Sequence, residues 1–508
     1  MRLVLKFVLA FFLTSIIILP QEKIIPEVYK NKNRKRRASL IAPKYPSYSL
    51  AATFLLKEKA TTGDPFAQHE LGLRYILGIG VPLDTLSAAE WIGKAASKSL
   101  PAANFNYGIM LHNGIGVKWN PFEAFKNFKV AAESGMEQAQ YIIGLMYTDN
   151  LIVSKNLAEA KKWLVKSADK GFEDAVKALK KFKKQGLIGT YDSLKSNSEQ
   201  HDERKNYRTF ISNDYELDFY DFGDDSLSKA DETELLNEIL SSDKEELKRK
   251  LKVSKYDSTN SDTTAIDIIN YAANSGSPEA ILIKARILNN GVGVKPNHIL
   301  AASYFLKAFR LGSYKAAEEL LEISQINDFF KNLKKEVDSE NADAMYVWAG
   351  LIALGLDYRL TEKQALELLL RAEKKKHIYS IIELGLANYS GSLVKKDSLK
   401  ALEYFKLASE LGSEEAAVRL ALIEIQSYQG SNIYKQIKLL RQQADKGSVL
   451  AEAALAYCYD KGIGFTKNKS KAAIFYRRAA QRGNEAAFNS LIKMYNELRP
   501  PDEEFIIY

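Results

Sequence analysis

The side chains that could bind a metal or act in catalysis are few and far apart in this sequence. His69-Glu70 begins like the helix of a zinc protease, but the second histidine, four residues on, is missing. The five histidines lie far from one another: His69, His112, His201, His298 and His377. Because no two of them have the spacing of metal ligands on a helix, we expect neither a metal nor a cofactor. We expect His69 and His112 to lie on the surface or in a turn.

Other possible motifs also have plain explanations. The Gly-x-Gly pairs lack both the preceding strand and the following Lys-Ser/Thr of a phosphate-binding loop. No Gly-x-Ser-x-Gly nucleophile elbow occurs, and the acidic pair Glu414-Glu415 fits a solvated helix end. Cys458 is the only cysteine, which excludes an intrachain disulfide, and it is expected to be a small, half-buried core residue. We therefore expect no enzymatic activity.

A regular ladder of small residues defines the elements that hold these groups. Four alanines lie 36 residues apart in the first part of the chain: Ala67, Ala103, Ala139 and Ala175. After an interruption the ladder continues, with one serine, in steps of 28 to 36 residues: Ala280, Ala316, Ala344, Ser380, Ala416, Ala451 and Ala487. A fixed period of this length is typical of one structural unit copied many times. Small side chains let two helices approach closely, so we expect these alanines to be buried.

Each copy has the pattern of a helix, a turn and a second helix. In the first copy, Ala67, Leu71 and Tyr75 recur every four residues on one helix face, and the segment 78–82 then breaks the helix. A second helical pattern follows from Ala88. The glycine turn recurs in four copies: Gly78, Gly80, Gly114, Gly116, Gly291, Gly293, Gly462 and Gly464. One such hairpin cannot bury its apolar face alone, so the copies are predicted to stack.

Two segments of the first copy, GDPFAQHELGLRYILGIGV and AAEWIGKAA, resemble the Sel-like repeat family, the longer-turn relatives of tetratricopeptide repeats. The resemblance covers residues 63–186 and 263–497, although the turn has decayed at residues 150–152. It implies an all-α fold, a right-handed α-solenoid of about ten to eleven helix-turn-helix repeats in two blocks. It also implies a concave surface that binds a protein or peptide partner. The family's disulfide-stapled branch has paired cysteines, which this chain lacks.

The ladder and its interruptions predict how the chain is divided. We expect a signal peptide or short signal anchor at 1–20, a basic Pro-containing linker at 21–50, a first repeat block at 51–186, an acidic, aromatic and partly disordered insert at 187–230, a degenerate helical repeat at 231–275, a second repeat block at 276–498 and a tail at 499–508. The short step from Ala316 to Ala344 marks an irregular unit that should change the direction of the superhelix. The tail is expected to be frayed, with Phe505–Ile507 as an alternative cap for the last exposed face.

The insert has a composition unlike that of the repeats. Residues 187–262 hold nineteen Asp and Glu against eleven Lys and Arg, and residues 214–222 alternate acidic and aromatic side chains. A disordered linker is one interpretation of this composition. The alternative is a docking segment that places Phe219, Tyr220 and Phe222 into an apolar groove, either of this chain or of a partner.

The amino-terminal residues carry much of the net charge of +9. Residues 1–44 hold ten Lys and Arg against two Glu, so the repeats have only a mild positive bias, which argues against nucleic-acid binding. Arg2 and Lys6 precede the uncharged segment Phe7–Leu19, which resembles a secretory signal but is short for a bilayer span of about 20 residues. The basic cluster Lys30–Arg37 opposes export if this segment is not cleaved. We expect an extracytoplasmic location, with possible membrane association through this segment; a cytoplasmic location is the alternative.

Three functions fit these observations. The leading hypothesis is a non-enzymatic scaffold or adaptor that binds a protein or peptide partner through the concave surface, in the cell envelope or the secretory pathway. One alternative is a hydrolase acting on cell-wall or polysaccharide material and built on the same repeats. The other is a membrane-anchored structural organiser.

Overall fold

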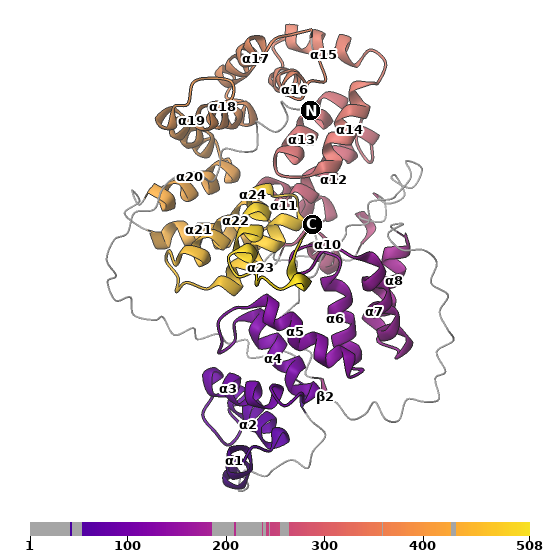
Figure 1. Ribbon diagram of the computed structural model, residues 1–508. Helices are drawn as coiled ribbons and strands as arrows, with labels where there is room; N and C mark the ends of the chain where they lie inside the picture. The colour runs from indigo at the N-terminus through magenta and orange to yellow at the C-terminus, as the bar shows by residue number, and fades with distance from the viewer. Residues whose placement is uncertain are drawn as a thin grey trace. The chain divides into compact units, whose positions relative to one another are not determined.

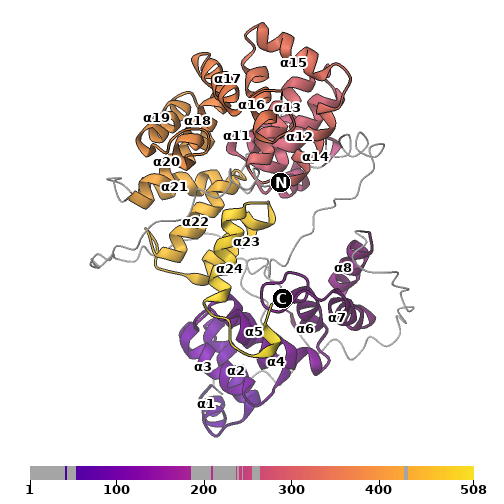
Figure 2. The same ribbon diagram turned by 45° about the horizontal axis from the view of Figure 1, so that its top comes forward.

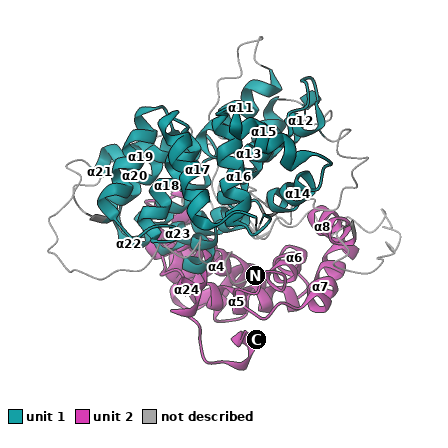
Figure 3. Cartoon of the chain, turned by 90° about the horizontal axis from the view of Figure 1, so that it is seen from above, with its two compact units in different colours: residues 1–18, 227–491 teal, residues 19–226, 492–508 magenta. Residues whose placement is uncertain are grey.

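A computed structural model of the protein describes residues 53–184, 244–253, 264–427 except 358, and 433–507, together with short pieces at 41–42, 208–209, 236 and 240–242. The chain divides into two compact units (Figures 1 and 3). Unit 1 comprises residues 1–18 and 227–491, and unit 2 comprises residues 19–226 and 492–508.

The described part of unit 2 is a stack of antiparallel helix pairs. Its helices are α1 (Thr53–Thr61), α2 (Pro65–Leu77), α3 (Thr85–Ala96), α4 (Pro101–Asn113), α5 (Pro121–Glu133), α6 (Glu137–Met146), α7 (Leu157–Asp169) and α8 (Glu173–Lys184). The pairs α2–α3, α4–α5 and α6–α7 pack within themselves, and the second helix of each pair packs on the first helix of the next. Two short strands, β1 (Ile41–Ala42) and β2 (Arg208–Thr209), form an antiparallel pair with Ile41 opposite Thr209. The C-terminal residues of the unit end in a 3₁₀ turn, η4 (Glu503–Phe505).

Unit 1 continues the same plan. Its helices are α10 (Lys244–Lys250), α11 (Ala265–Ser275), α12 (Pro278–Asn290), α13 (His298–Arg310), α14 (Tyr314–Ser324), α15 (Phe329–Asp338), α16 (Ala342–Ala353), α17 (Glu362–Lys374), α18 (Ile378–Ser390), α19 (Ser398–Glu410), α20 (Glu414–Ser427), α21 (Ile433–Asp445), α22 (Val449–Lys461) and α23 (Lys469–Gln481). The division between the units falls within α24 (Glu485–Asn496). In the irregular repeat, α14 and α15 pack weakly on each other, and α13 packs directly on α16 (Figure 2).

Local sequence explains where these helices begin and end. Asn120 accepts a hydrogen bond from the Glu123 N–H at the start of α5, and Pro121 occupies the first helical position, where no N–H is needed. At the other end of the preceding helix, Gly114 has a φ of 63° and its N–H bonds to the Met110 carbonyl. All eight turn glycines identified in the sequence have positive φ, between 63° and 75°. Glycine adopts this region without steric cost, which explains the sharp reversal between paired helices.

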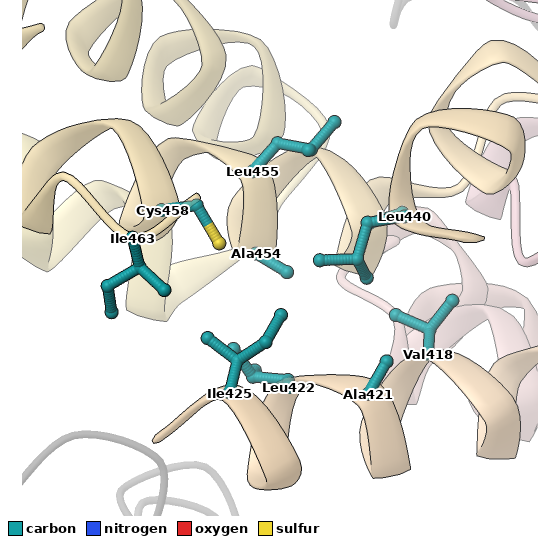
Figure 4. Packing of buried hydrophobic residues seen from close by; sticks show 10 residues of the cluster. Val418, Ala421, Leu422, Ile425, Leu440, Ala454, Leu455, Cys458 and Ile463 are labelled. Atoms are coloured by element: carbon teal, nitrogen blue, oxygen red, sulfur yellow. The ribbon is translucent and has the colours of Figure 1, made fainter. Parts of the chain in front are cut away.

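Small residues hold the stack together. The ten alanines of the ladder have exposed fractions of 0–1%. Larger side chains fill the space between neighbouring pairs, as in the cluster of α20, α21 and α22 in Figure 4. Cys458 lies in this cluster with its sulfur beside Ala454 and Ile425, and it is fully buried rather than half-buried. Burial raises the pKa of the Cys458 thiol to about 12, so the thiol stays protonated and unreactive at neutral pH.

Candidate peptide-binding site

In unit 2 the C-terminal residues pack against the second repeat. The Phe505 side chain is fully buried and meets the rings of Phe122 and Phe125 edge to face, with centroid separations of 5.2 and 5.8 Å. Tyr495 packs in the same manner on Trp119, at 5.2 Å. Edge-to-face pairs of this kind are favourable beyond the area they bury. The C-terminal segment, yellow in Figure 2, therefore has a defined apolar anchor on α5.

Charged side chains of α5 bind the acidic residues that precede this anchor. The Lys126 Nζ donates to the Asp502 Oδ2 over 2.8 Å, and Lys129 forms an ion pair with Glu504. The hydrogen bonds that Lys126 donates to Asp502 and Lys129 donates to Glu504 raise the pKa of each lysine. Phe122, Phe125, Lys126 and Lys129 have the spacing of a single helix stripe, i, i+3, i+4 and i+7. One face of α5 thus offers an apolar half and a basic half.

The turn after α6 supplies backbone contacts. The Ser154 hydroxyl donates to the Ile506 carbonyl over 2.7 Å. The Arg499 guanidinium donates to the carbonyls of Leu151, Ile152 and Phe505, over 2.8, 3.2 and 2.7 Å. Leu151 and Ile152 are both buried. We call this surface, made of Trp119, Phe122, Phe125, Lys126, Lys129 and the turn 147–154, the tail site.

Two sequence-based predictions concern this region. The prediction that the tail would be frayed is wrong, because residues 502–506 contact α5 and the turn 147–154 through side chains and backbone. The alternative prediction, that residues 505–507 cap the last exposed face, did not include the contacts that Phe505 makes with the second repeat. The predicted docking residues Phe219, Tyr220 and Phe222 lie outside the described residues, so the docking hypothesis for the insert stays a prediction.

The sequence contains a signal for the tail site that the repeat pattern alone does not assign. The turn that lost its glycines carries three consecutive apolar residues, Leu151–Val153, and all three are buried. In the preceding turn, Trp119 stands where other copies have Leu83, Pro296 or Lys467. Large apolar residues in a turn that is normally solvated indicate that something covers it.

Unit 1 has a second polar cluster, which we call the inner network. The Arg310 guanidinium binds Glu383 at 2.6 Å and Glu415 at 2.7 Å, and Glu415 also binds Arg419 at 2.9 Å. The partners of Arg310 lie 73 and 105 residues away in the sequence, on α18 and α20. Side chains from repeats so far apart meet across the inside of a curved stack. The inner network therefore joins α13, α18 and α20 through the protein's own charged side chains.

The electrostatics of the inner network are those of a structural ion-pair cluster. Burial alone would raise the pKa of Glu415, but Arg310 and Arg419 hold it at about 2. Burial lowers the pKa of Lys307 to about 8, although the nearby Glu415 opposes this shift. Acids at the starts of helices and bases at the ends of helices also complement the helix dipoles. Glu415 is thus permanently charged at neutral pH and matched by cations.

A second set of ion pairs closes unit 1 on itself. The Arg482 guanidinium, at the end of α23, binds Glu279 at 2.7 Å and Glu452 at 2.9 Å, and donates to the Gly447 carbonyl at 2.6 Å. Glu279 lies 203 residues before Arg482, at the start of α12. The α12–α13 and α22–α23 pairs are therefore held together by charged side chains, of which Arg482 and Glu452 are buried. We call this set the closing network.

These contacts correct the interpretation of Glu414-Glu415 as a solvated helix end. Glu415 is only 2% exposed, and Glu414 bonds to Ser275 and to Lys446. The expectation that His69 and His112 lie on the surface or in a turn is also wrong, because both side chains are buried. His69 is fully buried, its Nε2 lies 2.7 Å from the Asn106 Nδ2, and burial lowers the pKa of its imidazole to about 3. This histidine stays neutral and serves packing.

Among the residues that the structure describes, no group of three or more His, Cys, Asp or Glu could hold a metal ion. Within the same residues, no helix has the length and apolarity needed to cross a membrane.

Comparison with known proteins identifies the repeat. The Sel1 repeat family matches residues 65–100, 101–136, 137–172, 285–313, 378–413 and 449–484. A mouse protein named DAP3-binding cell death enhancer 1 is 29% identical over 106 residues, which are 21% of this chain and 21% of the mouse protein. The chain thus aligns with about a fifth of that relative's length.

Two solved structures are also similar. A protective antigen of uropathogenic Escherichia coli, described as having an SLR fold, is 21% identical with a TM-score of 0.31, over 88% of this chain and 84% of the antigen. A Sel1 repeat protein of Oxalobacter formigenes is 36% identical with a TM-score of 0.24, over 25% of this chain and 96% of its own. The repeat matches and the stacked helix pairs together show that the chain belongs to the Sel1 repeat family and folds as an α-solenoid.

Proposed function

We propose that this protein is a non-enzymatic adaptor whose first repeat block binds a peptide segment of a protein partner. Sel1 repeats commonly mediate protein–protein interactions. The mouse relative is itself named for binding another protein. The observation that carries the proposal is the tail site, where repeat side chains bind a peptide segment through an aromatic anchor, two ion pairs and backbone hydrogen bonds.

The place of binding differs from the concave surface favoured by the repeat pattern. In unit 1, the inner network ties together three helices from different repeats, and its ion pairs would have to separate before a ligand could enter between them. Breaking one partner from a buried pair typically costs about 3–5 kcal/mol. At the tail site the ion pairs that must separate are partly exposed, with Lys126 at 45% and Lys129 at 36%, so their separation costs less. We therefore propose unit 2 as the binding block.

For location, we propose an extracytoplasmic protein. The support is the uncharged segment Phe7–Leu19 behind Arg2 and Lys6. Fractionation of cells that express the tagged chain, with and without residues 1–44, tests this. The full chain is expected outside the cytoplasm and the shortened chain inside it; an equal distribution of the two would contradict the proposal.

The adaptor proposal is tested by capturing partners from cells of the native organism after gentle crosslinking. The informative variant is Lys126→Glu with Lys129→Glu, which reverses the basic half of the tail site. Lys177→Glu with Lys180→Glu on α8 is the matched control, because both side chains are exposed and have the same spacing and charge. We expect one partner with the wild type and the control but not with the site variant. Capture that is the same for all three would contradict binding at the tail site.

A further inference from the structure

The contacts of the tail site fix the positions of the acidic residues of a bound peptide relative to its phenylalanine. Lys126 binds an acid three residues before the anchoring phenylalanine, and Lys129 binds an acid directly before it. Glu503, between these acids, is exposed, and Ile506, after the anchor, is 40% exposed. The contacts therefore select acid-x-acid-Phe, with strict requirements at these three named positions and tolerance both at the residue between the acids and at the residue after the phenylalanine.

The stripe that makes this selection belongs to the second repeat alone among the three successive repeats of unit 2. The positions 36 residues before Phe122, Phe125, Lys126 and Lys129 hold the residues of the first repeat: Leu86, Ala89, Glu90 and Gly93. The positions 36 residues after them hold the residues of the third repeat: Ala158, Lys161, Lys162 and Val165. Neither set combines two aromatic rings with two following lysines. The recognition chemistry is thus a local specialisation of a generic repeat.

Resting on the proposed function, we infer that the partner presents an acidic peptide of the form acid-x-acid-Phe, and that the chain's own residues 502–506 are an internal competitor for it. A ligand tethered by a short linker has an effective concentration of about a millimolar. A partner peptide must compete with this tethered segment, so its apparent affinity is reduced. Release of the C-terminal residues switches the site to its open form.

One other segment of the chain has the same pattern. Glu216-Leu217-Asp218-Phe219-Tyr220 has acids three residues and one residue before a phenylalanine and an apolar ring after it. A synthetic peptide of residues 214–222 therefore tests the proposed acid-x-acid-Phe pattern independently, because the pattern was derived from the contacts of residues 502–506 and not from this segment. It should displace a labelled peptide of residues 499–508 from the open site.

The test measures binding of the labelled 499–508 peptide to the full chain by fluorescence anisotropy. Phe505→Asp should release the internal competitor and tighten binding at least tenfold relative to the wild type. Adding Lys126→Glu and Lys129→Glu should abolish binding of this peptide but permit binding of one that carries Asp502→Lys and Glu504→Lys. Lys177→Glu with Lys180→Glu in the Phe505→Asp chain should leave binding unchanged, and circular dichroism checks that each variant is folded.

Three outcomes overturn the inference. The first is equal binding to the wild type and to the Phe505→Asp chain, because the internal segment would not then compete. The second is failure of the charge-swapped peptide to bind the charge-swapped site. The third is failure of the 214–222 peptide to displace the label. If the peptide results hold but cellular capture finds no partner that depends on the tail site, the recognition stands and the adaptor function fails.

Discussion

Replacing Arg482 by methionine removes the centre of the closing network while keeping a side chain of similar length. Arg482 is only 8% exposed, and it donates to Glu279, Glu452 and the Gly447 carbonyl. Glu452, itself 6% exposed, would be left buried without its cation. Removing one partner of a buried ion pair costs about 3–5 kcal/mol, which is roughly two to four orders of magnitude in an equilibrium constant.

The loss of stability in Arg482→Met should depend on pH. Burial already raises the pKa of Glu452, and Arg482 opposes this shift. Without the cation, the pKa of Glu452 rises further above its unfolded value, so the folded variant binds more protons than the unfolded variant. Its stability relative to the wild type must then improve as the pH falls from about 7.5 to about 5.

Hydrogen exchange measured by mass spectrometry is the suitable assay, because it reports on the closing contacts without requiring a two-state transition of the whole chain. Amides of α12 and α22 should exchange faster in Arg482→Met at neutral pH and partly recover at about pH 5. Lys363→Met, an exposed site on α17, is the control and should change neither helix. Exchange that is unchanged in Arg482→Met, or faster by the same amount at both pH values, would refute the reasoning.

Three further predictions follow from the same structure. The pKa of Glu415 is held at about 2 in the folded chain, so the ionised carboxylate stabilises the fold fully at a pH above its pKa in the unfolded chain. This contribution is lost as the pH falls towards 2. Glu415→Gln should therefore be less stable than the wild type by about 3 kcal/mol at pH 7 but nearly equal to it near pH 2, as measured by urea unfolding. Gly116→Ala should destabilise the stack by several kcal/mol, since its Cβ would lie 1.8 Å from the Thr85 carbonyl oxygen, whereas Gly293→Ala has open space and should cost only about 1–2 kcal/mol of backbone strain, a contrast that thermal denaturation can measure. Ala139→Leu should overpack a fully buried position and cost about 1–3 kcal/mol in the same assay, and a neutral effect would contradict close helix packing there.

The sequence predicted the repeat architecture well because that information is local. A 36-residue period, a glycine turn and an apolar stripe are set by residues within one helix pair and its neighbour. The prediction of an α-solenoid built from Sel-like repeats is confirmed. The buried ladder alanines, such as Ala139, follow from the same local rules.

The networks could not be predicted in this way. Glu415 has the sequence context of a solvated helix start, and it is buried because Arg310, 105 residues earlier, reaches it across the curve of unit 1. Which residues meet there depends on a small rotation accumulated over several repeats, and no single repeat contains that information. The tail site has the same origin, since Lys126 and Asp502 are 376 residues apart. The apolar turn at 151–153 and Trp119 in the preceding turn hinted that a covering segment exists.

The most direct test of the central claim, that the second repeat holds the C-terminal peptide, is zero-length carbodiimide crosslinking of the monomeric full chain. The reagent joins a lysine to a carboxylate only where the two are in contact. Mass spectrometry should find Lys126 joined to Asp502 and Lys129 joined to Glu504, with the Lys446–Glu414 pair of unit 1 as an internal positive control. Phe505→Asp should abolish the first two links and keep the control. A wild-type monomer that yields the control link but neither link to the C-terminal residues would contradict the account.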